Sequence, residues 1–411
     1  MSLILKRSFS SSVCSRQVKL NPVYILSGAR TPIGAFNGSL KSISAVELGT
    51  IAVKAAVERA GLANKDVQEL YMGQVLQGNV GQSPARQVVI KAGLPESTEA
   101  TTINKVCSSS LKAVSIATQS IQVGDRDIIV AGGMESMSNS PFYLSRGSLN
   151  FGDVKATDSI IKDGLWDVYN NIHMGNCAEN TVKREKITRE QQDAYAIESY
   201  QRAIKAQREG LFNAEIIPVE IKSRNGTSVI SEDESPKTVR FDKIPTLKPV
   251  FDKQGTVTAA NSSSINDGAS ALVLASGNKA KKLNSPILAK VIAYADAATA
   301  PIDFTIAPSL AIPLLLKKAG LSISDIAKWE INEAFAAVSL ANNAILGLDA
   351  SKVNVKGGAI ALGHPVGSSG SRILVTLINS LKEGEYGVAA LCNGGGASTS
   401  VLVKKMSKVE E

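Results

Sequence analysis

The chain contains an internal duplication, which constrains its fold more than any other feature. Residues 60–62 read Ala-Gly-Leu, and so do residues 319–321, an offset of 319 − 60 = 259. Gly124, at the end of a predicted helix, matches Gly384 with an offset of 384 − 124 = 260. In each copy a helix, a glycine and a short loop precede a strand, and another helix and strand follow. This repeat predicts two α/β halves packed back to back, in five layers of the order α-β-α-β-α.

Individual elements indicate where the halves begin and end. Ser44 can cap a helix that runs to about Ala60, and the apolar runs 127–131 and 388–391 are typical of strands buried on both faces. The region between the halves is polar, with a charged helix expected over 188–210, and we expect it to cover the active site as a lid. The predicted parts are a leader at 1–21, an N-terminal half at 22–139 and 251–285, an inserted lid domain at 140–250, and a C-terminal half at 286–411.

The leader is basic, rich in serine and free of acids. The first acidic residue is Glu47, and four cations lie among several serines before residue 20. This composition is typical of a mitochondrial transit peptide, so we expect residues 1–21 to be removed before Pro22 and the protein to reside in the mitochondrial matrix. The alternative is a disordered tail.

Charge and cysteine usage limit the ligands. The net charge of +8 falls to 8 − 4 = +4 without the leader. This value, with no basic stripe interleaved with aromatics, argues against nucleic acid but suits an anionic ligand such as a phosphorylated cofactor. No apolar run approaches about eighteen residues, so no membrane helix is predicted. The four cysteines have neither metal-ligand spacing nor a disulfide pattern, and we expect free thiols.

Cys107 is the first candidate catalytic residue, in the sequence Val-Cys-Ser-Ser at 106–109. It lies at the start of a predicted helix, where the helix dipole and free N–H groups favour a thiolate. A thiolate exchanges readily with the thiol of a thioester, so we predict that Cys107 is a nucleophile that carries an acyl group. The alternative is a small buried core residue.

His364, one of only two histidines, lies in the glycine-rich loop 357–367. Glycines let backbone and ligand approach closely, and Pro365 keeps His364 out of helical conformation. We predict that its imidazole takes the proton of Cys107 and then donates to a thioester oxygen. The alternative is a structural histidine.

Cys392 lies at the end of the last predicted strand, followed by Asn-Gly at 393–394. The repeat places it opposite Gly132, and ends of such strands build sites in α/β proteins. We predict that its thiol is a general acid and base for the hydrogen beside a thioester carbonyl. The N–H groups of Gly394 and Cys107 would hold the resulting oxyanion. The alternative is a core thiol.

Asn332 lies at a predicted junction of strand and helix, in Asn-Glu-Ala-Phe at 332–335. An amide can anchor a water molecule or donate to an oxyanion without titrating. Its alternative role, which does not exclude the first, is the N-cap of the following helix.

These four segments resemble the active-site loops of the thiolases, in order and over about residues 22–404. The resemblance implies that Cys107 takes the acyl group, that His364 activates it, and that Cys392 transfers the proton at C2. It also implies one oxyanion hole from His364 and a water on Asn332, and another from the N–H groups of Cys107 and Gly394. Cleavage of 3-ketoacyl-CoA by CoA and the reverse condensation of two acetyl-CoA molecules would share this path. No covalent cofactor is implied.

Within the thiolases the chain looks like the mitochondrial branch that acts on acetoacetyl-CoA. His173 and Met174 are similar to side chains that crowd the acyl pocket of short-chain enzymes, although a surface-loop histidine is the alternative. Phe304 matches a residue beside the pocket for branched substrates, where Thr305 replaces an expected proline. Positions that match CoA contacts are Tyr200, Thr238, Val239, Arg240, Lys243 and Ser263, with Thr238 in place of an arginine.

The same branch binds potassium and forms tetramers, so the resemblance implies both here. Positions that match the potassium ligands are Tyr200, Ala259, Ala260, Ser262 and Ile360, and carbonyl oxygens suit a hard cation. Two rivals remain at this point. A thiolase for longer 3-ketoacyl chains would keep the same four loops, and a non-catalytic lipid carrier with the thiolase fold would not need them.

Overall fold

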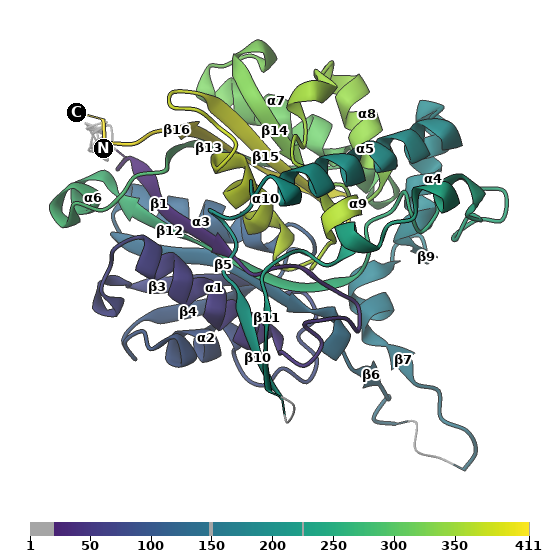
Figure 1. Ribbon diagram of the computed structural model, residues 1–411, viewed down its shortest axis with the longest axis horizontal. Helices are drawn as coiled ribbons and strands as arrows, with labels where there is room; N and C mark the ends of the chain where they lie inside the picture. The colour runs from purple at the N-terminus through teal and green to yellow at the C-terminus, as the bar shows by residue number, and fades with distance from the viewer. Residues whose placement is uncertain (1–19, 148–150, 224–225, 411) are drawn as a thin grey trace, which may run out of the picture.

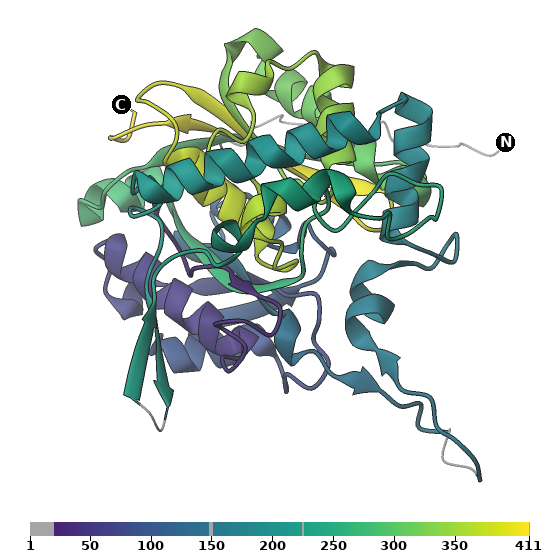
Figure 2. The ribbon, with the colours of Figure 1, turned by 45° about the vertical axis from the view of Figure 1, so that its right-hand side comes forward.

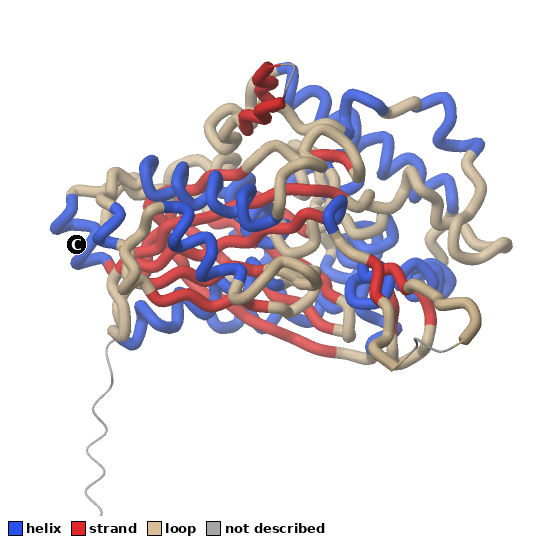
Figure 3. The backbone as a smooth tube through the Cα atoms, turned by 90° about the horizontal axis from the view of Figure 1, so that it is seen from below, coloured by secondary structure: helices blue, strands red, loops and turns tan. Residues whose placement is uncertain are grey.

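The computed structural model describes residues 20–147, 151–223 and 226–410 (Figure 1). The expected transit peptide therefore lies outside the described residues, apart from Leu20 and Asn21. The strands run side by side through the body of the molecule, with helices above and below them (Figure 3).

The two halves are joined into one mixed sheet of ten strands. Their edge strands β1 and β13 pair in antiparallel fashion, with Val23 opposite Val291. The order along the sheet is β4-β3-β5-β12-β1 in the first half and β13-β16-β15-β14 in the second, and β2 pairs with β12. The N-terminal strands are β1 (Val23–Arg30), β2 (Gly34–Ala35), β3 (Glu69–Gly73), β4 (Glu99–Ile103), β5 (Ile128–Ser136) and β12 (Asn266–Ser276); the C-terminal strands are β13 (Ala289–Ala298), β14 (Ile326–Ile331), β15 (Tyr386–Asn393) and β16 (Ala397–Lys405).

The helices complete five layers, as predicted. In Figure 1, α1 and α2 cover the lower side and α7 and α8 the upper side. Between the halves, α3 contacts β5 and β16, while α10 contacts β12 and β15. The helices of the two halves are α1 (Ala45–Arg59), α2 (Pro84–Ala92), α3 (Ser109–Val123), α6 (Gly277–Leu283), α7 (Ala307–Ala319), α8 (Ala336–Leu346), α9 (Ala359–Leu362) and α10 (Ser369–Ile378).

Strand β5 shows why the sequence produces layers. Successive side chains of a strand point to opposite faces, so Ile128 and Val130 join the outer core beneath α1, while Ile129 and Ala131 join the central core around α3 and α10. Both faces are therefore buried, which explains the continuous apolar run. A third core lies beneath α7 in the C-terminal half.

Local signals at helix ends acted as predicted. Ser44 caps α1 and forms a capping box with Glu47, whose carboxylate accepts a hydrogen bond from the Ser44 N–H at 2.9 Å. Gly124 follows α3 with a φ of +83°, a left-handed conformation that glycine adopts without strain.

The segment between the halves supplies two long helices and several short hairpins. Helix α5 lies across α8 and α9, and the hairpin of β6 and β7 extends away from the body (Figures 1 and 2). The elements here are β6 (Phe142–Tyr143), β7 (Thr157–Asp158), β8 (Trp166–Asp167), β9 (Ile172–His173), α4 (Met174–Glu185), α5 (Arg189–Arg208), β10 (Val219–Ser223) and β11 (Gly226–Ile230).

Short helical turns connect the longer elements. They are η1 (Asn64–Asp66), η2 (Met137–Asn139), η3 (Ile160–Leu165), η4 (Ser235–Thr238), η5 (Phe241–Thr246), η6 (Pro301–Ile306), η7 (Ile323–Asp325) and η8 (Ala350–Lys352). Within the described ranges, no helix combines the length and the apolar character that crossing a bilayer requires.

Candidate active site

One cavity of about 490 Å³ gathers residues from both halves and from the inserted segment. Cys107, His364 and Gly394 line it together. Six more of the predicted residues line the same cavity: His173, Met174, Ala259, Ser262, Ser263 and Phe304. The structure therefore brings the predicted nucleophile, base and oxyanion donor to one space.

A strained loop presents Cys107. Val106 has a φ of +48°, a left-handed conformation that is unusual for a β-branched residue. The surrounding contacts hold it there: Lys105 contacts Asp296 at 2.5 Å, and the Ser108 hydroxyl donates to the Leu391 carbonyl at 3.0 Å. The second bond ties the residue after Cys107 to the residue before Cys392. Such strain persists only where its surroundings enforce it and is typical of functional sites.

The predicted thiolate character of Cys107 is wrong for the free protein. Helix α3 begins only at Ser109, so Cys107 lies outside its first turn. Burial raises the pKa of the Cys107 thiol to about 11, although the Gly394 N–H donates a hydrogen bond to its sulfur and opposes the shift. The charge of Glu135 raises this pKa further. Desolvation outweighs the backbone donors here, so the thiol needs a base.

His364 has the properties of that base. Its ring Nδ1 lies 2.6 Å from the Ser369 hydroxyl, which itself lies 3.0 Å from the Pro365 carbonyl oxygen. If the hydroxyl donates its only proton to that carbonyl, it accepts from His364 Nδ1–H, which leaves a lone pair on Nε2. The buried Nε2 has no hydrogen-bond partner among the described residues. Burial, assisted by the charge of Arg372, lowers the pKa of His364 to about 3, so the ring is neutral.

Cys392 and Asn332 lie at the ends of the neighbouring parallel strands β15 and β14. The Cys392 thiol is buried, and its desolvation together with the charge of Cys107 raises its pKa well above the ordinary value. The Asn332 N–H donates to the Ala390 carbonyl at 3.0 Å. Both polar atoms of the buried Asn332 side chain lack a hydrogen-bond partner within the described part of the chain. The predicted capping role is wrong, because Phe335 is the N-cap residue of α8.

Aromatic residues restrict the acyl end of the cavity. His173 stacks on Phe251 with ring centroids 4.7 Å apart, and Phe335 contacts both Phe251 and Phe304 edge to face. The His173 ring accepts the Gly175 N–H at Nδ1, so its orientation is fixed. Met174 and Cys392 belong to the same packed cluster as Phe304. His173 therefore belongs to the cavity wall and not to a surface loop.

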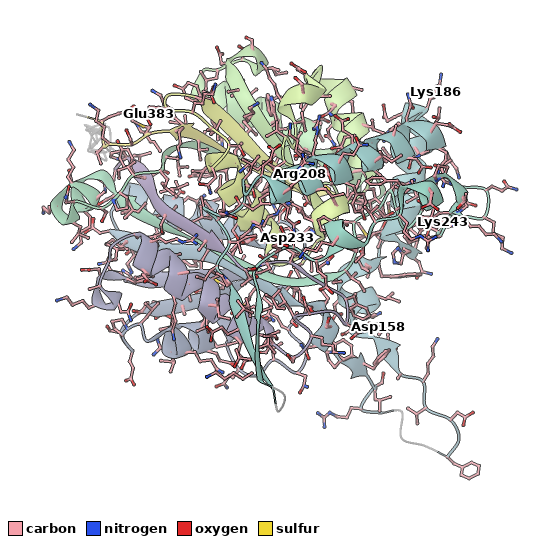
Figure 4. The ribbon with its side chains drawn as sticks, in the orientation of Figure 1. Asp158, Lys186, Arg208, Asp233, Lys243 and Glu383 are labelled. Carbon is pink, nitrogen blue, oxygen red and sulfur yellow. The ribbon has the colours of Figure 1, made fainter. Side chains whose placement is uncertain are left out.

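The predicted CoA contacts fall into two groups. Ser263 lines the cavity and donates through its hydroxyl to the Ala334 carbonyl at 3.0 Å. Val239 instead lines a separate groove of about 370 Å³ beside α5, with Lys237 and Arg208. Lys243 is exposed at the surface, toward the right of the molecule in Figure 4. The remaining three positions line neither space: Tyr200 lies on α5 and packs against the cluster of Ile33 and Leu362, Thr238 is the last residue of η4, and Arg240 directly precedes η5.

The predicted potassium positions lie around the contact of α5, α8 and α9. Tyr200 and Ile360 belong to one packed cluster with Ala336, and Ser262 pairs with Phe335. Among the described residues, no backbone hydrogen bond ends on the carbonyl oxygens of Ala259, Ala260 or Ser262. These oxygens are therefore available to a cation.

Sequence reasoning missed three residues that support the site. Ser369 orients His364, Asp296 holds Lys105, and Glu135 accepts hydrogen bonds from the backbone around the cavity. An acid within the otherwise apolar strand β5 was a usable signal for Glu135. No local pattern marks Asp296, because its partners are almost two hundred positions away.

Comparisons with known proteins agree with this geometry. The family descriptions "Thiolase, N-terminal domain" and "Thiolase, C-terminal domain" match residues 23–278 and 285–405. The chain is 67% identical to an acetyl-CoA acetyltransferase of Yarrowia lipolytica, over 95% of this chain and 98% of the relative. It is 58% identical to a mitochondrial acetyl-CoA acetyltransferase of Gibberella zeae, over 98% and 95% of the two chains.

A solved structure shows the same fold. The Acat5 thiolase from Ascaris suum, determined in complex with coenzyme A, superposes with a TM-score of 0.91 at 51% identity, over 94% of this chain and all of that one. The resemblance drawn from four short loops is thereby confirmed over nearly the full length. The chain belongs to the thiolase family.

Proposed function

We propose that the protein is an acetyl-CoA C-acetyltransferase, which cleaves acetoacetyl-CoA with CoA and catalyses the reverse condensation of two acetyl-CoA molecules. The observation that carries this proposal is the convergence of Cys107, His364 and Gly394 on one cavity. Cys392 packs in one cluster with Met174 and Phe304, which line that cavity, and Asn332 lies at the end of the neighbouring strand. The relatives named acetyl-CoA acetyltransferase support it and do not favour a longer-chain thiolase or a lipid carrier.

In the first half-reaction, His364 Nε2 takes the proton of the Cys107 thiol. The thiolate attacks the 3-keto carbon of acetoacetyl-CoA, and the N–H groups of Cys107 and Gly394 stabilise the oxyanion. The C2–C3 bond then breaks. Cys392 gives its proton to C2 of the departing acetyl-CoA, whose enolate oxygen is stabilised by protonated His364 and by a water held on Asn332. An acetyl group remains on Cys107.

In the second half-reaction, the Cys392 thiolate takes the proton of an incoming CoA thiol. The CoA thiolate attacks the acetyl carbon, Cys107 leaves, and His364 returns its proton to the Cys107 sulfur. Every group regains its starting state. The high pKa of both cysteines suits this cycle, because each sulfur is a thiolate only while its proton resides on a partner.

The cavity supports a short acyl group. Met174, His173 on Phe251, and the pair Phe304–Phe335 surround its end with rigid side chains. Thr305, where a proline was expected, is buried, and its hydroxyl bonds to that of Thr181. Its polar atom therefore has a partner outside the cavity, and Phe304 is the member of this pair that meets the substrate.

We infer that CoA enters beside α5. Ser263 would meet the pantetheine arm within the cavity, while Tyr200, Thr238, Val239, Arg240 and Lys243 would lie along the path to the surface. The exposed cations Arg240 and Lys243 suit the phosphates of CoA.

We infer that Tyr200, Ala259, Ala260, Ser262 and Ile360 hold a potassium ion. Among the described residues no backbone hydrogen bond reaches the carbonyls of Ala259, Ala260 and Ser262, and such oxygens fit a monovalent cation. The carboxylate of Glu333 is buried nearby, accepts hydrogen bonds from Tyr195, Ser199 and the Ile360 N–H, and has no cationic partner among the described residues. Its charge favours a cation here. Potassium should raise the unfolding temperature more than sodium at equal ionic strength.

We also infer a homotetramer in the mitochondrial matrix, with acyl-CoA and CoA as its partners. The mitochondrial relative supports the compartment. The projecting hairpin exposes Phe142 and Leu144, which suits contact with other copies of the chain. Light scattering of the purified protein tests the assembly.

The test of function is CoA-dependent cleavage of acetoacetyl-CoA against 3-ketooctanoyl-CoA, at equal low concentrations with potassium present. A strong preference for acetoacetyl-CoA is expected. A preference for the longer substrate would be consistent with the mechanism but would refute the assignment to short-chain substrates. If neither substrate is cleaved, the proposal that the protein is a thiolase enzyme is refuted.

A further inference from the structure

Glu135 is a buried acid that the proposed mechanism does not use. It lies near the end of β5, and its side chain has no exposure to solvent. One carboxylate oxygen accepts the N–H groups of Val75 and Gly367, both at 2.9 Å, and the other accepts the Leu76 N–H at 3.2 Å. Three backbone N–H groups thus donate to one fully buried carboxylate. These hydrogen bonds offset the free-energy cost of burying an acid, and they link the backbone at Val75 and Leu76 to that at Gly367.

The three donors belong to the two walls that hold the predicted nucleophile and base. Val75, Leu76 and Val366 pack in one cluster, with Cys107 against it. Gly367 lies three residues after His364 in the same loop, just before α10 begins. Besides this packing, the Glu135 carboxylate connects the wall beside Cys107 to the loop that carries His364 by hydrogen bonds.

The internal duplication shows what this carboxylate replaces. Gly367 is the counterpart of Cys107, since 367 − 107 = 260, and the residues that follow read Ser-Ser in both copies. A Cβ atom placed on Gly367 would lie 2.7 Å from a Glu135 carboxylate oxygen. Glu135, together with the Met134 carbonyl and the Gln74 backbone, therefore fills the space that a cysteine side chain would need in the second copy. The Gly367 N–H, the counterpart of the Cys107 N–H, donates to that carboxylate.

We propose that Glu135 is a positioning residue for the thiolase reaction. Its carboxylate holds the N–H group of Gly367, the counterpart of the oxyanion donor at Cys107, and so fixes the loops of Cys107 and His364 relative to each other. This inference rests on the proposed function. It assigns a role to the second copy of the repeat, in which Gly367 stands where the first copy has Cys107.

Two substitutions test the length of the Glu135 side chain and its charge separately. Glu135→Gln keeps the length and one acceptor but removes the charge, while Glu135→Asp keeps the charge but is one methylene too short to reach all three donors. Asp267→Asn is the matched control, because Asp267 is equally buried at the same end of the sheet but bonds to Ser138 and not to the catalytic loops.

The first measurement is the cleavage of acetoacetyl-CoA. A displacement of about 1 Å between catalytic groups costs about 100-fold in rate. We therefore expect kcat to fall about 10- to 100-fold in both Glu135 variants, with KM changed far less, and to stay near that of the unsubstituted protein in Asp267→Asn.

The second measurement is the rate at which iodoacetamide alkylates Cys107 in the folded protein, from pH 7 to 9. Burial raises the pKa of Glu135 itself to about 7, so its carboxylate is mostly charged only above that pH. Loss of this charge lowers the pKa of the Cys107 thiol, so Glu135→Gln should react faster, by roughly 2-fold or more at about pH 8 to 9. Glu135→Asp should keep the original profile. If Glu135 only stabilised the fold, its replacement by glutamine would not accelerate the alkylation of Cys107.

Unchanged turnover and unchanged alkylation in both variants, or equal effects in Asp267→Asn, would overturn the proposal. If Glu135→Gln does not fold, Glu135→Asp still decides the question through the split between kcat and KM. If the unsubstituted protein cleaves no acetoacetyl-CoA, the proposed function fails, while the alkylation rates still test the link between Glu135 and Cys107.

Discussion

Replacing Ser369 by alanine should disable the base without disturbing the nucleophile. The Ser369 hydroxyl lies 2.6 Å from His364 Nδ1, and His364 is only 5% exposed. The space that the lost hydroxyl leaves is therefore largely closed to bulk solvent. The hydrogen bond to Ser369 favours the proton on Nδ1, because a buried donor left unpaired costs about 1–3 kcal/mol. Without that hydroxyl neither ring nitrogen has a partner among the described residues, so the ring also populates the tautomer with its proton on Nε2. That tautomer has no lone pair facing Cys107.

The free energy that favours the reactive tautomer of His364 is lost in this variant, and the rate of catalysis falls accordingly. We expect kcat/KM for acetoacetyl-CoA cleavage to fall about 10- to 100-fold, which corresponds to about 1.4–2.7 kcal/mol. Ser371→Ala is the matched control, since Ser371 is buried in the same helix but bonds to Ser270 and Ser368. Ser369→Thr, which keeps a hydroxyl, should recover part of the activity. Equal losses in the two alanine variants, or no loss in Ser369→Ala, would refute the assignment of the tautomer.

Further predictions follow from other contacts. Cys392→Ser should slow carbon–carbon cleavage more than acetyl exchange between CoA thioesters, and equal losses in both assays would contradict the division of roles between the cysteines. Because the pKa of His364 is lowered to about 3, kcat/KM should show no histidine titration between pH 5.5 and 8; a limb near pH 6.5 that disappears in His364→Gln would refute a neutral resting ring. Although partial burial opposes it, hydrogen bonds from Lys105, Lys112 and Thr399 lower the pKa of Asp296 to about 2, so its contribution to stability is present above the ordinary pKa of about 4 and is lost as the pH falls toward 2. Urea unfolding should therefore show a small loss, under about 1 kcal/mol, for Asp296→Asn at pH 7 and none near pH 2. Leu374→Ala, in the central core, should lower the free energy of unfolding by about 2–5 kcal/mol, and an effect as small as that of an exposed leucine would contradict the central layer.

The fold was predictable because its signals are local and repeated. The duplication predicted two halves, and the continuous apolar run of β5 predicted burial on both faces, which its alternating contacts explain. The pairing of β1 with β13 was not predicted, since nothing in either strand specifies a partner across more than 250 positions. The cap of α1 follows from Ser44 and Glu47 alone, whereas Asn332 fits the pattern of a cap yet lies three residues before the true one.

The candidate site, like the fold, could be predicted from the sequence only in part. Residue type and loop composition predicted Cys107, His364 and Cys392, which the structure places together. The ionisation of Cys107 could not be read from the sequence, because desolvation depends on which distant residues pack around the sulfur. The same reason hid Ser369 and Glu135, whose importance comes from what they touch.

The central claim, an acetyl group carried on Cys107, is tested most directly by mixing the protein with acetyl-CoA, quenching with acid and mapping the modified peptide by mass spectrometry. The account predicts an acetyl group on the peptide that contains Cys107, present in Cys392→Ser and absent in Cys107→Ser. An acetyl group on Cys392 instead, or none on either cysteine while the protein still cleaves acetoacetyl-CoA, would contradict it.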